Sequence, residues 1–390
     1  MTVRDQAAER YAELPVPDTT MEAWRFTDLK GFDPDSFARD AEPAAGGAEH
    51  FVDLDVAGMA VVTENGISIE HAPEGIRFEA LREDDPRLHS LVGWNEKFAA
   101  HNAAVWNHGL LVEVPRGVEL TKPLYVRIVS SVDGAALFWR LLVVAEEAAR
   151  FSLIEEYSSP RPDVAAYTNA VAELFVGQAA KLEYVSIQNL SQETWHFATH
   201  HARVERDAEL DWVAGGFGSK KGKIRIQNDL NGPGATSRVT GAYFADGDQH
   251  LDYDTFQEHI APNTESDFAF KGALREQASA VWRGMIRVEE DAQKTNAYQE
   301  NRNLLLSAKA HADSIPGLEI MANDVRCTHG ATIGRVNREE LFYLMARGLS
   351  RAEAERLIVR GFFQDILDRI DLEPVRDALA AALDARIPEA

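Results

Sequence analysis

From about residue 109 to residue 333, apolar and polar positions alternate with a period of two. Residues 109–129, GLLVEVPRGVELTKPLYVRIV, are apolar or alternating in short pieces that Pro and Gly interrupt. The same pattern returns at 137–157, 171–188 and 202–216. Alternation in short runs between turn residues is typical of β-strands. The pattern therefore predicts a long array of strands.

The turns between these strands end in a small residue at nearly regular intervals. The small residues are Ala149, Ala180, Ala208, Ala235, Thr264 and Ala292. The intervals between them are 31, 28, 27, 29 and 28 residues, and such a period indicates a repeat architecture. Helical patterns do not alternate with the strands, so a βαβ fold is poorly supported. We therefore predict a mainly β fold with a β-solenoid core at 109–333, and an antiparallel sandwich is the alternative.

The region before the strands, residues 1–108, has a mixed and partly helical pattern. Residues 84–106 have helical spacing through Leu88, Leu91 and Phe98, and residues 21–32 are amphipathic. We predict an N-terminal helical or mixed region that packs its aromatic side chains locally.

The pattern becomes helical again at 334–390, which we predict to be a C-terminal helical domain. Asn337 can cap a first helix that ends at Gly348, and Ser350 with Glu353 forms a capping box for a second helix. The apolar positions of the second helix form more than one stripe: Leu357, Ile358, Val359, Phe362, Phe363, Ile366, Leu367 and Ile370. Such a helix is either enclosed by its own chain or partly covered by a partner, and the period leaves both open.

Composition excludes several function classes. The chain has 40 Lys and Arg against 63 Asp and Glu, a formal net charge of −23, which disfavours binding to nucleic acid and to anionic membranes. No apolar run approaches the roughly 18 residues of a membrane span. The first residues, MTVRDQAAER, lack the apolar core of a secretory signal. With one Cys among 390 residues, we expect a soluble cytoplasmic protein.

The sequence lacks a phosphate loop and the common hydrolase motif. A phosphate loop around Gly222 and Lys223 would need Gly at 217 and Ser or Thr at 224, where the chain has Phe217 and Ile224. There is also no GxSxG motif. His196, His200 and His201 lie in a segment with strand character, where four residues span roughly 13 Å and neighbours face opposite sides. We therefore expect histidines stacked on the solenoid rather than a zinc chelate.

The segment VRCTHGATIG, 325–334, contains the only cysteine, two residues before His329. In extended backbone, Cys327 and His329 point to the same side, roughly 6–7 Å apart. Thiolate and imidazole are good iron ligands, but two ligands are too few for a complete site. The residues alone allow two interpretations: half of a shared metal site, or a buried thiol beside a histidine that hydrogen-bonds within a turn.

Four segments resemble the SufB/SufD family of the SUF system for iron–sulfur cluster assembly, and the SufD branch in particular. The segments are EAWRFTDL at 22–29, HLDYDTFQEHIAPNTESDFAFKGAL at 250–274, YQENRNLLLS at 298–307, and 316–363 with CTHGATIG followed by two helices. SufB-type chains carry a functional cysteine where this chain has Asn301, so the resemblance favours SufD. The resemblance covers nearly the whole chain.

The resemblance implies a right-handed parallel β-helix between the two helical regions, and a non-catalytic scaffold in a SufBCD complex. It implies pairing with SufB through the end strands, and binding of the SufC ATPase through C-terminal helices that carry Phe342, Leu357, Phe362 and Phe363. It also implies that His329, with Cys327 beside it, holds a nascent cluster transiently at the SufB interface, with no cofactor stably bound by the chain alone.

Three alternatives remain at this stage. The chain could be a SufB-like paralogue, or it could form a homodimer through the same end strands when SufB is absent, because open strand edges seek partners. It could also be a β-helix enzyme or binding protein for polysaccharides, which would require an aromatic or acidic groove.

Overall fold

The computed structural model describes residues 2–43 and 49–387. Within these residues the strands form two sheets, one of ten strands and one of nine. The ten-stranded sheet contains β1 (Gly58–Thr63), β2 (Gly66–His71), β5 (Leu124–Val129), β7 (Arg150–Ser158), β9 (Lys181–Asn189), β11 (Glu209–Gly216), β13 (Thr236–Ala245), β15 (Glu265–Leu274), β17 (Asn296–Leu305) and β19 (Arg326–Arg335). The nine-stranded sheet contains β3 (Arg77–Ala80), β4 (His108–Val114), β6 (Ala136–Ala145), β8 (Tyr167–Val176), β10 (Trp195–Val204), β12 (Lys221–Leu230), β14 (His250–His259), β16 (Ser279–Val288) and β18 (His311–Ile320).

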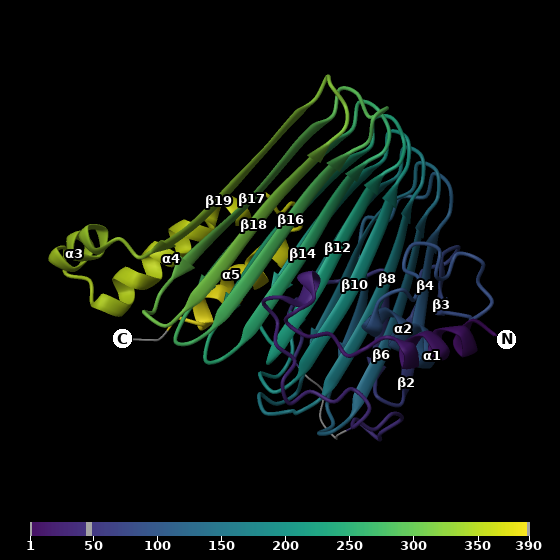
Figure 1. Cartoon of the computed structure of the whole chain (residues 1–390), viewed down its shortest axis with the longest axis horizontal. Helices are drawn as coiled ribbons and strands as arrows, with labels where there is room; N and C mark the ends of the chain where they lie inside the picture. Colours follow the sequence, from purple (N-terminus) through teal and green to yellow (C-terminus); the bar gives the residue numbers. More distant parts are fainter. Residues whose placement is uncertain (1, 44–48, 388–390) are drawn as a thin grey trace.

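From β4 onward, successive strands alternate between the two sheets, and each pairs in parallel with the strand one coil away (Figure 1). One coil therefore consists of one strand from each sheet, and β4 to β19 form eight coils in the described residues. This is a parallel β-solenoid, as the period predicted, and the parallel pairing excludes the antiparallel sandwich. The apolar side chains between the sheets form one continuous core along the lumen.

The small residues that revealed the repeat lie at one corner of the solenoid. Ala149, Ala180 and Ala208 each directly precede a strand of the ten-stranded sheet, and each is fully buried. The residue before each of them has a positive φ, as at Ala148 and Ala179. The corner thus requires a left-handed residue followed by a side chain small enough to turn inward.

The last corner residue of the predicted repeat, Ala292, was wrong. Thr295, not Ala292, follows a left-handed residue (Lys294) and directly precedes β17. The turn between β16 and β17 is longer than the corresponding turns from β6–β7 to β14–β15, so Ala292 lies earlier in that turn, although it is also buried.

Each outer face of the solenoid is partly covered by another part of the chain (Figure 1). Helices α4 (Arg351–Leu367) and α5 (Glu373–Ala385) pack on the ten-stranded sheet, where Phe363 and Leu379 share an apolar cluster with sheet residues such as Phe244. The N-terminal segment lies on the nine-stranded sheet, on the opposite side in Figure 1. There Phe32 and Phe98 pack among the aromatic side chains of β8 and β10.

The N-terminal region is less helical than its pattern predicted. Helix α1 (Val3–Glu13) is present, but the helix expected over 84–106 is limited to α2 (Lys97–Val105), and residues 21–32 contain only one 3₁₀ turn, Glu22–Trp24. Strands β1 to β3 extend the two sheets, so part of residues 1–108 is strand rather than helix. Aromatic residues in this region are anchored by tertiary packing, which does not require regular helix.

The C-terminal region contains helices α3, α4 and α5 in the described residues. Helices α4 and α5 share a core with the solenoid, so the broad apolar surface of α4 is largely enclosed by its own chain. Helix α3 (Arg338–Ala346) instead projects beyond the sheets (Figure 1). No helix in the described residues combines the length and the apolar character needed to cross a membrane.

Candidate functional site

Cys327 and His329 lie on the last strand of the solenoid. In the part of the chain that the structure describes, β19 pairs only with β17, and β18 pairs only with β16. Both sheets thus end in a ten-residue strand whose outer backbone groups have no neighbouring strand. Such edges bind further strands readily.

The side chains of Cys327 and His329 face the lumen side of this end. They pair in register with Ala297 and Gln299 of β17. Gln299 is buried and donates to the carbonyl oxygen of Gly317 on β18, across the lumen. Since residues paired in a parallel sheet share a face, Cys327 and His329 continue the lumen-facing row and lie at its mouth.

Several apolar side chains accompany them at the mouth. Leu318 and Ile320 of β18 pair with Ile286 and Val288, which are fully buried in the coil before. Leu318, Ile320 and Ile333 are themselves 37%, 40% and 44% exposed. We call the surface formed by Leu318, Ile320, Cys327, His329 and Ile333 the open end. It has the side chains of a core without the coil that would cover them.

The two polar groups of the open end differ in environment. His329 is exposed, whereas Cys327 is half-buried and packs against a small cluster that includes Ala297 and Ala322. Burial raises the pKa of the Cys327 thiol, although a backbone hydrogen bond with Ala297 opposes this. Since only the thiolate binds a metal strongly, coordination by Cys327 has to displace a proton.

The structure brings Cys327 and His329 together without further ligands. Over residues 2–43 and 49–387, no group of three or more His, Cys, Asp or Glu side chains could hold a metal ion. Two soft or borderline ligands suit iron, but they leave most of its coordination positions to other groups.

Asn301 lies in the lumen, one coil inside the open end. It is fully buried. Its amide nitrogen donates to the hydroxyl of Tyr243, at 3.3 Å, and its amide oxygen accepts from Asn303, at 2.6 Å. Asn301 is thus part of a closed polar network, with no thiol at its position.

The four helical residues predicted to contact a partner do not share one surface. Phe342 on α3 and Leu357 on α4 are 74% and 50% exposed. Phe362 is partly buried, and its ring lies 4.9 Å from the ammonium of Lys271. Phe363 is only 1% exposed because its side of α4 packs on the ten-stranded sheet. Phe363 is therefore excluded from an exposed partner surface.

Large apolar side chains remain exposed on α3 and on the neighbouring helix α4. Besides Phe342 and Leu357, it includes Tyr343 and Met345, which are 56% and 42% exposed. We call these four residues the α3 patch. Exposed large apolar side chains on neighbouring helices are typical of protein-binding surfaces.

The three histidines of β10 occupy opposite faces of the strand, as its character predicted. His196 and His200 point into the lumen, where burial lowers the pKa of each to about 3. His201 points outward and lies 2.7 Å from a carboxylate oxygen of Asp229. The arrangement places these side chains too far apart and on the wrong faces to bind one zinc ion.

Sequence reasoning missed the apolar part of the open end. Leu318, Ile320 and Ile333 have the same alternation as the core residues of earlier strands, so nothing local distinguishes them. The available signal was the change of pattern after residue 335, which marks the last coil and hence the exposed row.

Comparisons with known proteins agree with the fold and with the resemblance of the four segments. The sequence profile of the family described as SUF system FeS cluster assembly, SufBD core domain, matches residues 127–362. An iron–sulfur cluster assembly SufBD family protein of Mycobacterium tuberculosis is 31% identical over 379 residues, covering 95% of this chain and 89% of that protein. The iron–sulfur cluster assembly proteins SufB and SufD of Bacillus subtilis are each 30% identical, over 72% and 75% of this chain and 60% and 67% of their own lengths. The chain therefore belongs to the SufBD family of the SUF system for iron–sulfur cluster assembly.

Proposed function

We propose that this chain is a SufD-type scaffold, without catalytic activity of its own, which joins a SufB-type chain at the open end and a SufC-type ATPase at the α3 patch. The observation that carries the proposal is the open end, where two ten-residue strand edges and lumen-facing apolar side chains are exposed together. A related solenoid would satisfy the backbone edges and cover the apolar residues at once.

The SufD assignment is supported by Asn301. The family resemblance places the functional cysteine of SufB-type chains at this position, and here the side chain is a buried amide in a closed hydrogen-bond network. SufB and SufD of Bacillus subtilis are equally identical to this chain, so the assignment depends on this residue. A homodimer through the open end is expected when the SufB-type partner is absent.

At the proposed interface, His329 and Cys327 would contribute two ligands to a nascent iron–sulfur cluster, which is cargo rather than a resident cofactor. The imidazole of His329 is exposed at the mouth and can reach a neighbouring chain. Cys327 lies on the same side of β19 and would supply a thiolate after losing its proton. The remaining ligands would come from the partner.

The test of the cluster site is His329→Ala, co-expressed with the SufB- and SufC-type partners from the same source. The variant is expected to form the complex but to lose most of its bound iron and sulfide, because His329 is exposed and contributes little to the fold. Thr328→Ala is the matched control. Thr328 is the neighbour of His329 in β19 and faces outward, so this variant should keep its full cluster content. Equal cluster content in both variants would show that His329 is not a ligand of the cluster.

The test of the interface is Ile333→Glu, with Thr332→Glu on the outer face of β19 as its control. A charge at Ile333 would be buried when a partner docks, and the loss is expected to be at least tenfold in affinity, whereas Thr332→Glu should bind almost normally. Size-exclusion chromatography and titration with the SufB-type chain measure the difference. Normal assembly of Ile333→Glu would place the interface elsewhere.

The test of the ATPase-binding surface is the double substitution Phe342→Ala and Leu357→Ala. Because both side chains are largely exposed, the chain should fold normally while its affinity for the SufC-type ATPase falls at least tenfold. The purified chain alone should hydrolyse no ATP. Unchanged ATPase binding by the folded double variant would contradict a contact at the α3 patch.

A further inference from the structure

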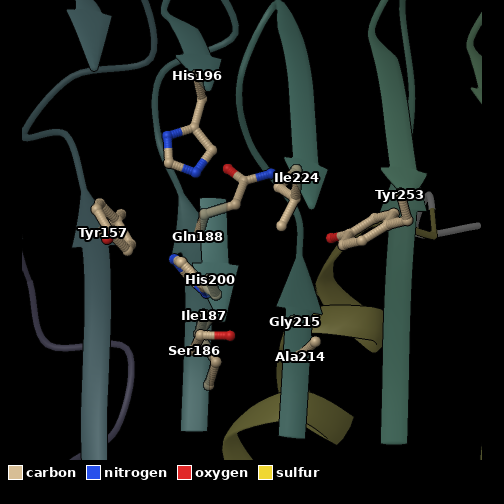
Figure 2. Close-up of a pocket in the computed structure, with 10 residues that line it drawn as sticks. All are labelled: Tyr157, Ser186, Ile187, Gln188, His196, His200, Ala214, Gly215, Ile224 and Tyr253. Carbon is tan, nitrogen blue, oxygen red and sulfur yellow. The ribbon is translucent and has the colours of Figure 1, made fainter. Parts of the chain in front are cut away.

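A small cavity lies inside the lumen, in the middle coils of the solenoid (Figure 2). Side chains from both sheets line it, among them Tyr157, Gln188, His196, His200 and Tyr253. The centre of a water molecule can range over about 20 Å³ in this cavity. One water needs roughly 10–15 Å³ by the same measure, so the space suffices for one molecule.

His200 is the most unusual residue around the cavity. Its side chain is 3% exposed, and in the described part of the chain neither ring nitrogen has a hydrogen-bond partner. The nearest carboxylate oxygen, Glu155 Oε2, lies 3.8 Å from Nε2, which is too far for a hydrogen bond. Glu155 is instead held by hydrogen bonds from Trp139, Tyr157 and Tyr184.

The protonation state of His200 determines which hydrogen-bond partners its ring lacks. Burial keeps the imidazole neutral at ordinary pH, with its pKa lowered to about 3. A neutral imidazole has one N–H donor and one acceptor nitrogen. Leaving both unsatisfied in a dry core is costly, and native structures rarely do so.

His196 provides an internal comparison. It lies on the same strand and the same face, and it is buried as deeply. Its Nδ1, however, lies 2.7 Å from the hydroxyl oxygen of Thr168, a satisfied hydrogen bond. Since His196 also lines the cavity, the lack of partners is specific to His200 and not common to the buried histidines of this strand.

Other polar groups around the cavity can complete a water site. Gln188 donates through Nε2 to the carbonyl oxygen of Gly218, at 3.0 Å, while its buried Oε1 has no protein partner in the described residues. The hydroxyl of Tyr253 points toward the middle of the lining residues in Figure 2. A buried water usually makes about three hydrogen bonds, and the unpartnered polar atoms of His200 and Gln188 are available to it among the lining residues.

We propose that this cavity is a binding site for one internal water molecule, hydrogen-bonded to a ring nitrogen of His200 and to Gln188 Oε1 or the Tyr253 hydroxyl. The lining is better suited to neutral water than to a cation, because both histidines are neutral and the described residues form no metal-binding group here. The water would be a permanent part of the solenoid, independent of any partner.

The direct test is a crystal structure of the full chain at a resolution that shows ordered water. The expected result is density for one water at about 2.7–3.2 Å from a ring nitrogen of His200. An empty cavity would overturn the proposal, and so would a rotated His200 that bonds directly to Glu155.

A solution test uses His200→Phe, whose ring fills the site without a polar atom. In the unsubstituted chain, buried protons around the cavity should show magnetisation transfer from a long-lived water, and this signal should vanish in His200→Phe. If that variant does not fold, Gln188→Leu serves instead and should weaken the signal. Absence of the signal in the unsubstituted chain, or its persistence in the folded His200→Phe chain, would contradict the proposal.

Discussion

Replacing Glu173 with alanine should destabilise the attachment of the N-terminal region to the nine-stranded sheet. Glu173 lies on β8 and is only 1% exposed. Its carboxylate accepts from the backbone N–H groups of His89, Leu91 and Val92, at 2.9–3.1 Å. It also accepts from Arg140 Nη1 at 3.1 Å. One side chain thus binds both a buried cation and the loop that precedes α2.

The magnitude follows from the burial of Arg140. This side chain is 1% exposed, and desolvation lowers its pKa to about 10 even though Glu173 opposes the shift. Removing one member of a buried ion pair costs about 3–5 kcal/mol, because the other charge remains without compensation. The freed loop amides can turn to water, so they add less. We expect Glu173→Ala to lower the free energy of unfolding by about 3–5 kcal/mol.

Two further variants distinguish the ion pair from simple loss of packing. Arg140→Met leaves a carboxylate that still has three N–H donors, so it should cost less than Glu173→Ala. Arg140→Met combined with Glu173→Leu removes both charges and should cost less than the sum of the two single changes.

Chemical denaturation followed by circular dichroism measures these differences, and hydrogen exchange locates them. Exchange should accelerate first in the loop before α2, because a solenoid can open locally. The reasoning fails if Glu173→Ala costs less than about 1 kcal/mol, or if Arg140→Met is the more damaging variant.

Three other outcomes are expected. Burial lowers the pKa of His196 and His200 to about 3, so the unfolded chain binds more protons than the folded chain below pH 6.5. The free energy of unfolding should therefore be highest above that pH, fall by about 1.4 kcal/mol for each histidine at pH 5.5, and fall further toward pH 3. An unchanged denaturation midpoint between pH 7.5 and 5.5 would contradict this. Phe363→Ala should cost about 3–5 kcal/mol and increase hydrogen exchange in α4, whereas normal exchange there would mean that the helix does not depend on this contact. Gly241→Ala should lower the free energy of unfolding by about 1–3 kcal/mol, measured by thermal unfolding, because the new Cβ would lie 2.1 Å from the ring of Phe270. Gly361→Ala on α4, where nothing lies within 4 Å of the new Cβ, should instead stabilise the protein by about 0.5–1 kcal/mol.

Much of the solenoid could be predicted because its rules are local. Alternation identifies strands, and each corner needs a left-handed residue followed by a small buried one, as at Ala179 and Ala180. The predicted β-solenoid is confirmed, and its strands from β4 to β19 span residues His108 to Arg335. The error at Ala292 arose because both Ala292 and Thr295 are small enough for the corner position. Only the strand register shows that Thr295 occupies it.

The helical regions were harder to predict because their partners are distant in sequence. Residues 84–106 have a helical period, yet most of the segment forms turns and bends that pack on the nine-stranded sheet. Period alone could not tell whether α4 was enclosed or exposed, and the answer differs between Leu357, which is half-exposed, and Phe363, which is buried.

The sequence by itself determined the repeat, the strand character of the core and the pairing of Cys327 with His329 on one face of a strand, because each follows from backbone geometry over a few residues. Only the tertiary structure decided that this face is the lumen side, that β18 and β19 are edges, and that Leu318, Ile320 and Ile333 are exposed. The physical reason is that every coil uses the same alternation and is covered by the next one. A side chain at the end of the stack differs from its equivalents only because no further coil follows in the described residues, and that is a property of the assembled fold.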